Sequence, residues 1–236
     1  MQVGAAAPSE ADRARWLEAD NEARPRRQDR LRAALEADGL HAYFGLKPEN
    51  SRYLTGFVLG DGEDKVAGAS GRFFVSADET VVVADSRYHL QALEEWPDSR
   101  VEDDRGGFAA AWPDLVSSLR PVGGGERVAR VGVEASVISH GAWEALAEAT
   151  PHVELVPTDG LVESARQTKE PHELERVAAA CRIADEALAQ TLPEIKVGIS
   201  ERELALSLEW KMRTGGADGL AFDVACLSGP RAARVL

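Results

Sequence analysis

Short apolar runs alternate with helical segments from residue 40 to residue 156, and this alternation restricts the fold more than any other feature of the sequence. The predicted strands are 40–44, 72–75, 80–84, 128–133 and 153–156. The second and third are joined by four small or polar residues, which predicts a β-hairpin. The others are separated by helical segments of about ten residues, a pattern typical of an α/β layer with a partly parallel sheet.

Helices are predicted before and between these strands. Their ranges are 26–38, 85–96, 112–119 and 139–149. Asp85 and Ser139 stand where a side-chain oxygen would cap the first turn of a helix. Several arginines crowd the first range and the residues just before it, and we expect them to form a solvated helix face beside acidic neighbours. The segment Asn50–Gly56 is predicted to be a turn.

A polar break at Pro157–Gly160 interrupts the pattern and predicts a domain boundary. The chain is therefore divided into a leader segment 1–25, an α/β domain 26–158 and a second region 159–236. The leader is rich in alanine and charged residues, which is compatible with a loose segment or an outer helix.

The second region contains two predicted helices followed by a strand over 220–227. The first helix begins at Pro171, and Ser200 with Glu203 forms a capping box at the start of the second. Apolar side chains recur at helical spacing along one stripe of each helix. They are Leu174, Val177, Ala178, Cys181 and Leu188 in the first helix, and Leu204, Leu208 and Met212 in the second.

Charge and composition exclude several classes of function. The formal net charge is -13, whereas binding to nucleic acid or to an anionic membrane requires a basic surface. No apolar run of about 18 residues occurs, so no transmembrane helix is predicted, and the first residues lack the pattern of a signal peptide. Cys181 and Cys226 are expected to be ordinary buried thiols, which suits a reducing cytoplasm.

No residue pattern predicts a metal site or a catalytic group. The histidines are scattered without ligand spacing. The acidic runs at 61–64 and 102–104 lack the register of a calcium loop, and we expect both to be surface charge clusters. The glycine run 123–125 is not followed by the lysine of a phosphate-binding loop, so it is predicted to be a turn.

Six short blocks of sequence occur in an order and at a spacing that together form a stronger signal than any one of them. They are NSRYLTGF at 50–57, ADSRY at 84–88, VGVE at 131–134, RQTKEPHEL at 166–174, GISERE at 198–203, and GLAFD at 219–223 with SGP at 228–230. Together they resemble the family of Xaa-Pro aminopeptidases, prolidases and creatinases. Members of that family join a creatinase-type N-terminal domain to an α+β "pita-bread" metallopeptidase domain.

The resemblance implies a fold and a chemistry. The expected fold is a creatinase-like α/β domain, with a mixed sheet flanked by helices, followed by the first helices and strand of the pita-bread domain. The related enzymes use two divalent ions (Mn, Co or Zn) to hydrolyse the peptide bond before proline. Their metal ligands follow the position of Pro230, where this sequence continues as RAARVL. We therefore expect a truncated chain that has no metal ligands or catalytic residues and is inactive alone.

The resemblance also suggests substrate contacts and partners. In the related enzymes the N-terminal domain helps to shape the substrate cleft, often across a dimer. Arg52 and Tyr53 are therefore candidates for contact with a peptide that has proline at its second position. The alternative is that Tyr53, Leu54 and Phe57 pack the turn beneath the sheet. We expect a cytoplasmic homodimer that binds neither nucleic acid nor membrane.

Three hypotheses about function remain open at this stage. The chain is the N-terminal portion of an Xaa-Pro aminopeptidase, a non-catalytic dimerisation or peptide-binding module, or a relative that acts on another substrate such as creatine or an Xaa-Pro dipeptide. In the second region, the two helices are expected to expose apolar faces meant for further strands, which predicts aggregation or a partner there.

Overall fold

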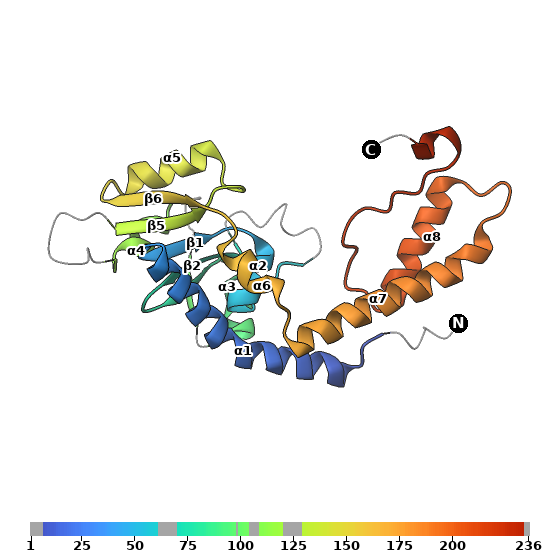
Figure 1. Cartoon of the computed structure of the whole chain (residues 1–236), viewed down its shortest axis with the longest axis horizontal. Coiled ribbons are helices and arrows are strands. Elements are labelled where there is room, and N and C mark those ends of the chain that lie inside the picture. The colour runs from blue at the N-terminus through green and yellow to red at the C-terminus, as the bar shows by residue number, and fades with distance from the viewer. Residues whose placement is uncertain (1–6, 61–69, 98, 104–108, 120–128, 234–236) are drawn as a thin grey trace. The chain divides into compact units, whose positions relative to one another are not determined.

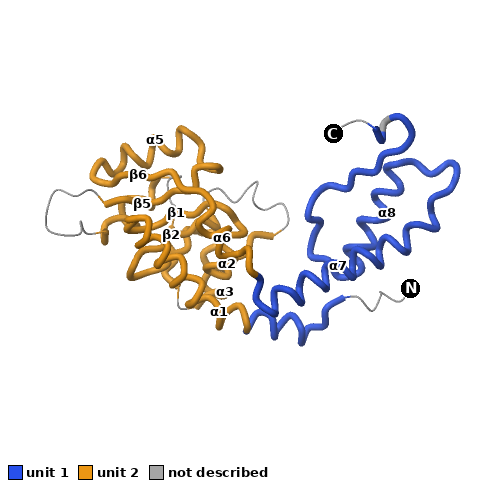
Figure 2. The backbone as a smooth tube through the Cα atoms, viewed as in Figure 1, with its two compact units in different colours: residues 1–18, 169–236 blue, residues 19–168 orange. Residues whose placement is uncertain are grey.

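The computed structural model describes residues 7–60, 70–97, 99–103, 109–119 and 129–233. The chain forms two compact units, 19–168 and 1–18 together with 169–236 (Figure 2). This division follows Thr168, whereas the sequence places the boundary at residue 158, because Val162 is buried in the core of the first unit. The predicted acidic loop at 61–64 and the glycine run 123–125 lie outside the described residues.

A six-stranded sheet forms the centre of the first unit (Figure 1). Its strands are β1 (Ala42–Gly45), β2 (Arg72–Ser76), β3 (Thr80–Val83), β4 (Arg100–Glu102), β5 (Ala129–Glu134) and β6 (Val153–Thr158). The spatial order is β4-β3-β2-β1-β5-β6, and β2 runs antiparallel to both of its neighbours while the other pairs are parallel. The predicted mixed sheet and the β2–β3 hairpin are confirmed. The short edge strand β4 is not predicted by the sequence.

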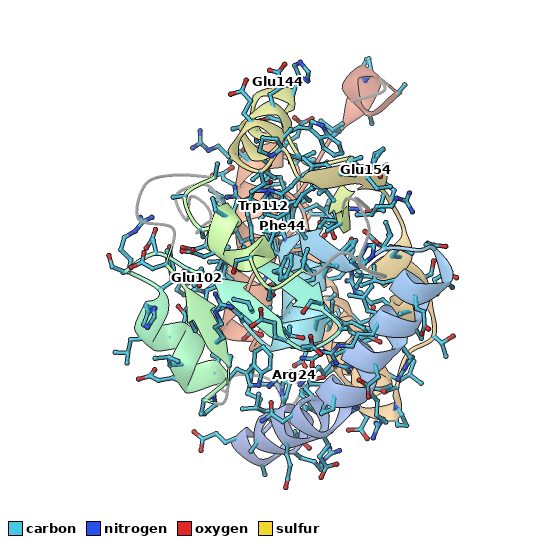
Figure 3. All side chains as sticks on the ribbon, turned by 90° about the vertical axis from the view of Figure 1, so that its left-hand side faces the viewer. Arg24, Phe44, Glu102, Trp112, Glu144 and Glu154 are labelled. Atoms are coloured by element: carbon cyan, nitrogen blue, oxygen red, sulfur yellow. The ribbon has the colours of Figure 1, made fainter. Side chains whose placement is uncertain are left out.

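Neighbouring residues of a strand point to opposite faces of the sheet, and both faces are buried. On one face Phe44 packs against Trp112, with ring centroids 5.3 Å apart (Figure 3). Phe74 packs against the same indole, with its ring centroid 6.3 Å away. On the other face Tyr43 and Phe73 belong to a second core. Because water reaches neither face, the strands read as continuous apolar runs rather than as alternating ones.

Helices cover both faces of this sheet. Their bounds are α1 (Glu10–Ala37), α2 (Pro48–Thr55), α3 (His89–Glu95), α4 (Trp112–Val116), α5 (His140–Ala149) and α6 (Leu161–Gln167). Side chains of α1, α2 and α6 share the core that contains Tyr43, and side chains of α4 and α5 share the core that contains Trp112. The predicted cap of α5 is confirmed, since the Oγ of Ser139 accepts a 3.2 Å hydrogen bond from the N–H of Ala142.

Three local predictions for this unit are wrong. Residues 50–56 do not form a turn, because Pro48 suits the first turn of a helix and Gly56 ends that helix with a left-handed φ of 84°. The helix predicted from residue 26 begins at Glu10, so most of the segment 1–25 is helical. Asp85 does not cap α3, which begins later at His89.

The prediction that the arginines of α1 form a solvated face is wrong for Arg24, Arg27 and Arg32. Arg24 is buried, with its guanidinium 5.5 Å from the ring centre of Trp96. Arg27 is buried, forms a 3.1 Å ion pair with Asp20, and holds its guanidinium 4.3 Å from the ring centre of Tyr53. Arg32 donates a 2.9 Å hydrogen bond to the carbonyl oxygen of Ser76. A planar guanidinium can stack on an aromatic ring while it donates hydrogen bonds, so arginine packs where lysine would not.

The second unit contains a pair of helices, α7 (Pro171–Thr191) and α8 (Glu201–Thr214), with the 3-10 turns η2 (Leu192–Glu194) and η3 (Gly229–Ala233). The predicted capping box of α8 is confirmed: the N–H of Glu203 donates to the Oγ of Ser200 at 3.2 Å, and the N–H of Ser200 donates to the Oε2 of Glu203 at 2.9 Å. A second capping box, formed by Glu170 and Glu173, starts α7. No helix in the described parts of the chain is long and apolar enough to cross a lipid bilayer.

Two predictions for this unit are wrong. Residues 220–227 form no strand but an irregular segment, because a strand needs a hydrogen-bonded neighbour and none is present for it among the described residues. Cys181 is exposed rather than buried, because it lies on the side of α7 away from the buried Ala179 and Ile183. Cys226 is partly exposed.

Candidate functional site

A buried carboxylate, that of Glu134, lies at the end of β5 with 1% of its surface exposed. Its Oε1 accepts hydrogen bonds from the hydroxyl of Tyr43 at 2.8 Å and from the side-chain amide of Asn50 at 2.7 Å. Its Oε2 accepts from the backbone N–H groups of Leu46 and Lys47, both at 2.7 Å. These four donors replace the water that an ionised carboxylate loses on burial, and they account for its presence in the core.

The parallel pairing of β1 and β5 places the two halves of this arrangement side by side. Phe44 pairs with Val133, so the chain leaves β1 next to the carboxylate of Glu134 and turns at once into α2. The turn requires glycine at position 45, because a Cβ there would lie 2.0 Å from the Cζ of Phe73. The local course of the chain therefore points the backbone N–H groups of Leu46 and Lys47 toward the carboxylate of Glu134.

A second set of polar contacts connects α2 to α6. The Oδ1 of Asn50, a fully buried residue, accepts a 2.8 Å hydrogen bond from Arg166, and its Nδ2 also lies 3.2 Å from the Oε1 of Glu163. The ammonium of Lys47 donates to the same oxygen of Glu163 at 2.5 Å. We call the six side chains of the two sets the polar network; its members are Tyr43, Lys47, Asn50, Glu134, Glu163 and Arg166.

The electrostatics of the polar network follow from burial and from its ion pair. Burial raises the pKa of the Tyr43 hydroxyl, and the negative charge of Glu134 raises it further. Burial opposes ionisation of Glu163, but hydrogen bonds from Lys47 and Asn50 outweigh it and lower the pKa of that carboxyl. The hydrogen bond to Glu163 raises the pKa of Lys47. These shifts keep Lys47 and Glu163 charged and the Tyr43 hydroxyl protonated. The hydrogen bonds of the network therefore persist and fix α2 on the sheet.

The two substrate-binding candidates lie on different sides of α2. Tyr53 is buried in the core with Leu54, and its hydroxyl lies 3.5 Å from the carbonyl oxygen of Ala165. Arg52 is exposed. The structure therefore does not bring the two side chains into one pocket, and Phe57 is buried in a third cluster of core residues.

Sequence reasoning missed the roles of Glu134 and Asn50, although both stand in blocks that carried the resemblance. The available signals were a lone acid at the end of an apolar strand and an asparagine at the start of a helix. Asp85, expected to cap and pin a helix, instead binds within a turn: it accepts a 2.9 Å bond from the N–H of Arg87 and a 2.6 Å bond from its guanidinium.

The described residues do not fit a metal centre. Among them, no group of three or more His, Cys, Asp or Glu side chains is placed to hold an ion. The buried carboxylate of Glu134 faces four hydrogen-bond donors, and donors of this kind repel a cation. The arrangement positions a helix, and it presents neither a nucleophile nor a set of metal ligands.

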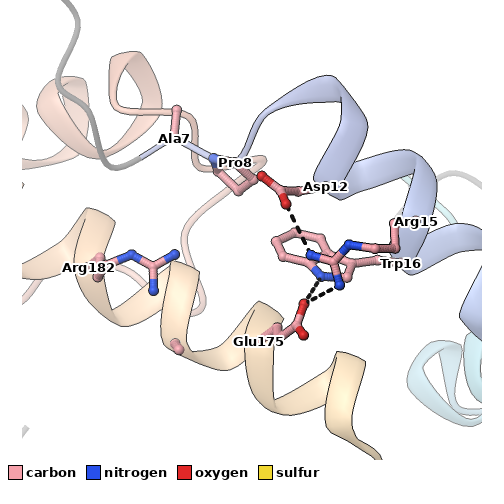
Figure 4. A pocket seen from close by; sticks show the side chains of 8 residues that line it. Ala7, Pro8, Asp12, Arg15, Trp16, Glu175 and Arg182 are labelled. Atoms are coloured by element: carbon pink, nitrogen blue, oxygen red, sulfur yellow. Dashed lines mark hydrogen bonds and ion pairs between the residues drawn. The ribbon is translucent and has the colours of Figure 1, made fainter.

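The second unit has a cavity of about 310 Å³ (Figure 4). It is lined by Ala7, Pro8, Asp12, Arg15, Trp16, Glu175, Ala178 and Arg182. At its edge one oxygen of Glu175 accepts from the indole N–H of Trp16 at 2.8 Å and from the guanidinium of Arg15 at 2.6 Å. These contacts join the start of α1 to α7.

The chain matches two family descriptions in succession. Residues 27–168 match "Creatinase/Prolidase N-terminal domain", and residues 175–235 match "Metallopeptidase family M24". An uncharacterized peptidase of Bacillus subtilis, YqhT, is 31% identical over 182 residues, which is 77% of this chain and 47% of that protein.

Two solved structures are similar to this chain. The Xaa-Pro dipeptidase from Bacillus anthracis superposes with a TM-score of 0.69 at 26% identity, over 84% of this chain and 51% of that chain. The X-Pro aminopeptidase from Thermotoga maritima superposes with a TM-score of 0.63 at 26% identity, over 78% of this chain and 49% of that chain. The chain thus spans about half the length of the proteins it matches.

Proposed function

Because this chain belongs to the creatinase/prolidase N-terminal domain family, we propose that it is the N-terminal portion of a metallopeptidase that hydrolyses the peptide bond before proline. The observation that carries the proposal is the succession of the two family matches, at 27–168 and at 175–235, in one chain. The similar solved structures include an Xaa-Pro dipeptidase and an X-Pro aminopeptidase, which supports a proline-containing peptide as the substrate.

The chemistry of this function is proposed to lie outside the chain. A pair of divalent ions (Mn, Co or Zn) needs several convergent carboxylate and imidazole ligands. The described residues contain no such group, and the carboxylate of Glu134 is committed to hydrogen-bond donors. The chain alone is therefore proposed to be inactive, with its ligands supplied by the part of the fold that the chain does not span.

The contribution of this chain is proposed to be substrate positioning. The polar network fixes α2, and α2 carries the exposed guanidinium of Arg52, a group suited to the carboxylate of a peptide. Tyr53, which is buried, is proposed to act on the substrate only through the position of α2. We further propose a cytoplasmic homodimer; the two free cysteines support a reducing compartment.

Sequencing the encoding DNA beyond the codon for Leu236, followed by assay of the whole encoded protein, tests the proposal. We expect an open frame with two Asp, one His and two Glu ligands, and metal-dependent hydrolysis of peptides with proline at the second position. Creatine is the control substrate. A frame without those ligands, or a protein that has them and does not cleave before proline, would overturn the proposal.

The alternative is a non-catalytic dimerisation or peptide-binding module. The lack of a metal-binding group among the described residues favours it. It predicts that the purified chain self-associates with a defined stoichiometry and melts cooperatively. Analytical ultracentrifugation and a thermal melt decide the matter together, because a monomer that melts without cooperativity excludes the module.

A further inference from the structure

The cavity of the second unit lies between α7 and the segment that leads into the start of α1 (Figure 4). Three of its lining residues, Glu175, Ala178 and Arg182, lie on α7. Glu175 and Arg182 are seven residues apart, which is about two turns of a helix, so both side chains project from the same side of α7. Ala178 lies between them. The cavity therefore has an acidic end, a basic end and a small apolar surface between the two.

The acidic end carries a net negative charge. Arg15 donates to the Oδ1 of Asp12 at 3.0 Å and to the Oε2 of Glu175 at 2.6 Å. Hydrogen bonds from Ser9 and Arg15 lower the pKa of Asp12, and those from Trp16 and Arg15 lower the pKa of Glu175, so both carboxylates are ionised at neutral pH. One guanidinium therefore faces two negative charges. The Oε1 of Glu175 accepts no hydrogen bond from the described residues and is open to a further cation.

The basic end is the guanidinium of Arg182. Its side chain is exposed, and it forms no hydrogen bond or ion pair with any residue that the structure describes. A guanidinium presents its donors in a planar fork that matches the two oxygens of a carboxylate. The charged residues that line the cavity, two acidic and two basic, therefore sum to zero, with the excess negative and positive charges at separate ends.

We propose that this cavity binds a linear zwitterion, with its ammonium on Glu175 and its carboxylate on Arg182. The cavity volume of about 310 Å³ stands at the lower end of the range found for small-molecule sites. Ala7, Pro8 and Ala178 line it with small apolar groups, which suits a ligand with a short apolar body between its two charges. The shape and the charge of the cavity thus select the same class of ligand.

The spacing of the two charges selects the length of the ligand. Seven residues of helix rise about 10 Å, and a charge-assisted hydrogen bond takes about 2.8 Å at each end. The charges of the ligand are therefore expected to lie about 5 Å apart. One amino-acid residue spans at most about 3.5 Å and two span at most about 7 Å. A single α-amino acid is too short, whereas a dipeptide or an ω-amino acid such as γ-aminobutyrate fits.

Isothermal titration calorimetry of the 236-residue chain tests the site, because binding requires no hydrolysis. The zwitterionic probes are alanyl-alanine, γ-aminobutyrate and alanine. Two capped dipeptides accompany them: N-acetyl-alanyl-alanine lacks the ammonium, and alanyl-alanine amide lacks the carboxylate. Arg182→Gln removes the charge of the basic end, and Ala178→Phe fills the cavity. Arg202→Gln is the matched control, because this exposed arginine lies on α8 outside the cavity.

We expect one equivalent of alanyl-alanine or of γ-aminobutyrate to bind, and the tighter of the two assigns the ligand to peptides or to ω-amino acids. Alanine and both capped dipeptides are expected to bind at least tenfold more weakly. Arg182→Gln and Ala178→Phe should each weaken binding at least tenfold, while Arg202→Gln leaves it unchanged.

Three results would overturn the proposal. They are the absence of binding by both longer zwitterions at millimolar concentration, a capped dipeptide that binds as tightly as the free one, and unchanged binding by Arg182→Gln. The capped dipeptides test the contacts on the unsubstituted chain, so the outcome does not depend on how the variants fold. Circular dichroism of each variant shows in addition whether its helical content is retained.

Discussion

Asn50 and Glu134 stand 84 positions apart in the chain and are joined by a 2.7 Å hydrogen bond in the core of the sheet domain. This bond links the first turn of α2 to the end of β5, and Arg166 extends it to α6. The conformation of α2, and hence the direction of Arg52, depends on contacts that are far apart in sequence.

Replacing Glu134 with glutamine is expected to destabilise the first unit. The amide has one acceptor oxygen, so the N–H groups of Leu46 and Lys47 or the amide of Asn50 lose their acceptor. An unsatisfied buried polar group costs about 1–3 kcal/mol, and we expect the free energy of unfolding to fall by about 3 kcal/mol. Urea unfolding measures it. Glu154→Gln, an exposed glutamate on β6, is the control and should change stability by less than about 0.5 kcal/mol.

A methyl group at position 45 is expected to displace the ring of Phe73. The added Cβ of Gly45→Ala would lie 2.0 Å from that ring, and overpacking of this kind costs about 1–3 kcal/mol. Gly141→Ala is the matched control, because nothing lies within 4 Å of its Cβ position in α5. That change should stabilise by about 0.5–1 kcal/mol. Thermal melts that show the same sign for both variants would contradict the packing of β1 on Phe73.

The stability of the first unit is expected to depend on pH through Glu163. A carboxyl with a lowered pKa stabilises the folded state fully above its unfolded pKa and loses this contribution as the pH falls through the folded pKa. Glu163 has such a pKa, below the usual 4.5. Glu163→Gln should therefore lower the free energy of unfolding at neutral pH, and its difference from the unsubstituted chain should shrink below about pH 4.5. A difference that stays constant from neutral to acid pH would show that the ion pair with Lys47 contributes nothing.

Substitutions at two arginines distinguish a residue that stabilises the fold from a residue proposed to contact substrate. Arg27→Ala should destabilise the chain by about 2 kcal/mol or more, because it removes the buried ion pair with Asp20 and the guanidinium that covers the ring of Tyr53. Arg52→Ala should change stability by less than about 0.5 kcal/mol, because Arg52 is exposed. In an active, extended protein we expect Arg52→Ala to raise KM for an Xaa-Pro peptide with kcat less affected. An unchanged KM would remove Arg52 from the substrate site.

Local signals were sufficient to predict the elements that depend on few neighbours. The hairpin of β2 and β3, the Ser139 cap of α5 and the Ser200–Glu203 capping box all follow from residues close together in the chain. The series of six blocks likewise led to the family, since order and spacing can be read without contacts.

The remaining features depend on contacts that the sequence does not display. The helix at 48–55 was predicted as a turn because Asn50 and Ser51 are common turn residues, and only the structure places both in the core. Cys181 was predicted to be buried because it stands among apolar residues at helical spacing, and periodicity cannot tell which side of α7 is covered. The polar network joins residues from both ends of the first unit, so no spacing in the sequence predicts it.

The most direct test of this account is metal binding and peptide cleavage by the purified 236-residue chain. Equilibrium dialysis against Mn²⁺, Co²⁺ and Zn²⁺ is combined with an assay on a dipeptide and a tripeptide that have proline at the second position. We predict no stoichiometric binding of metal and no cleavage, because the described residues form no metal centre. Binding of two equivalents of metal with cleavage before proline would contradict the claim that the catalytic chemistry lies outside this chain.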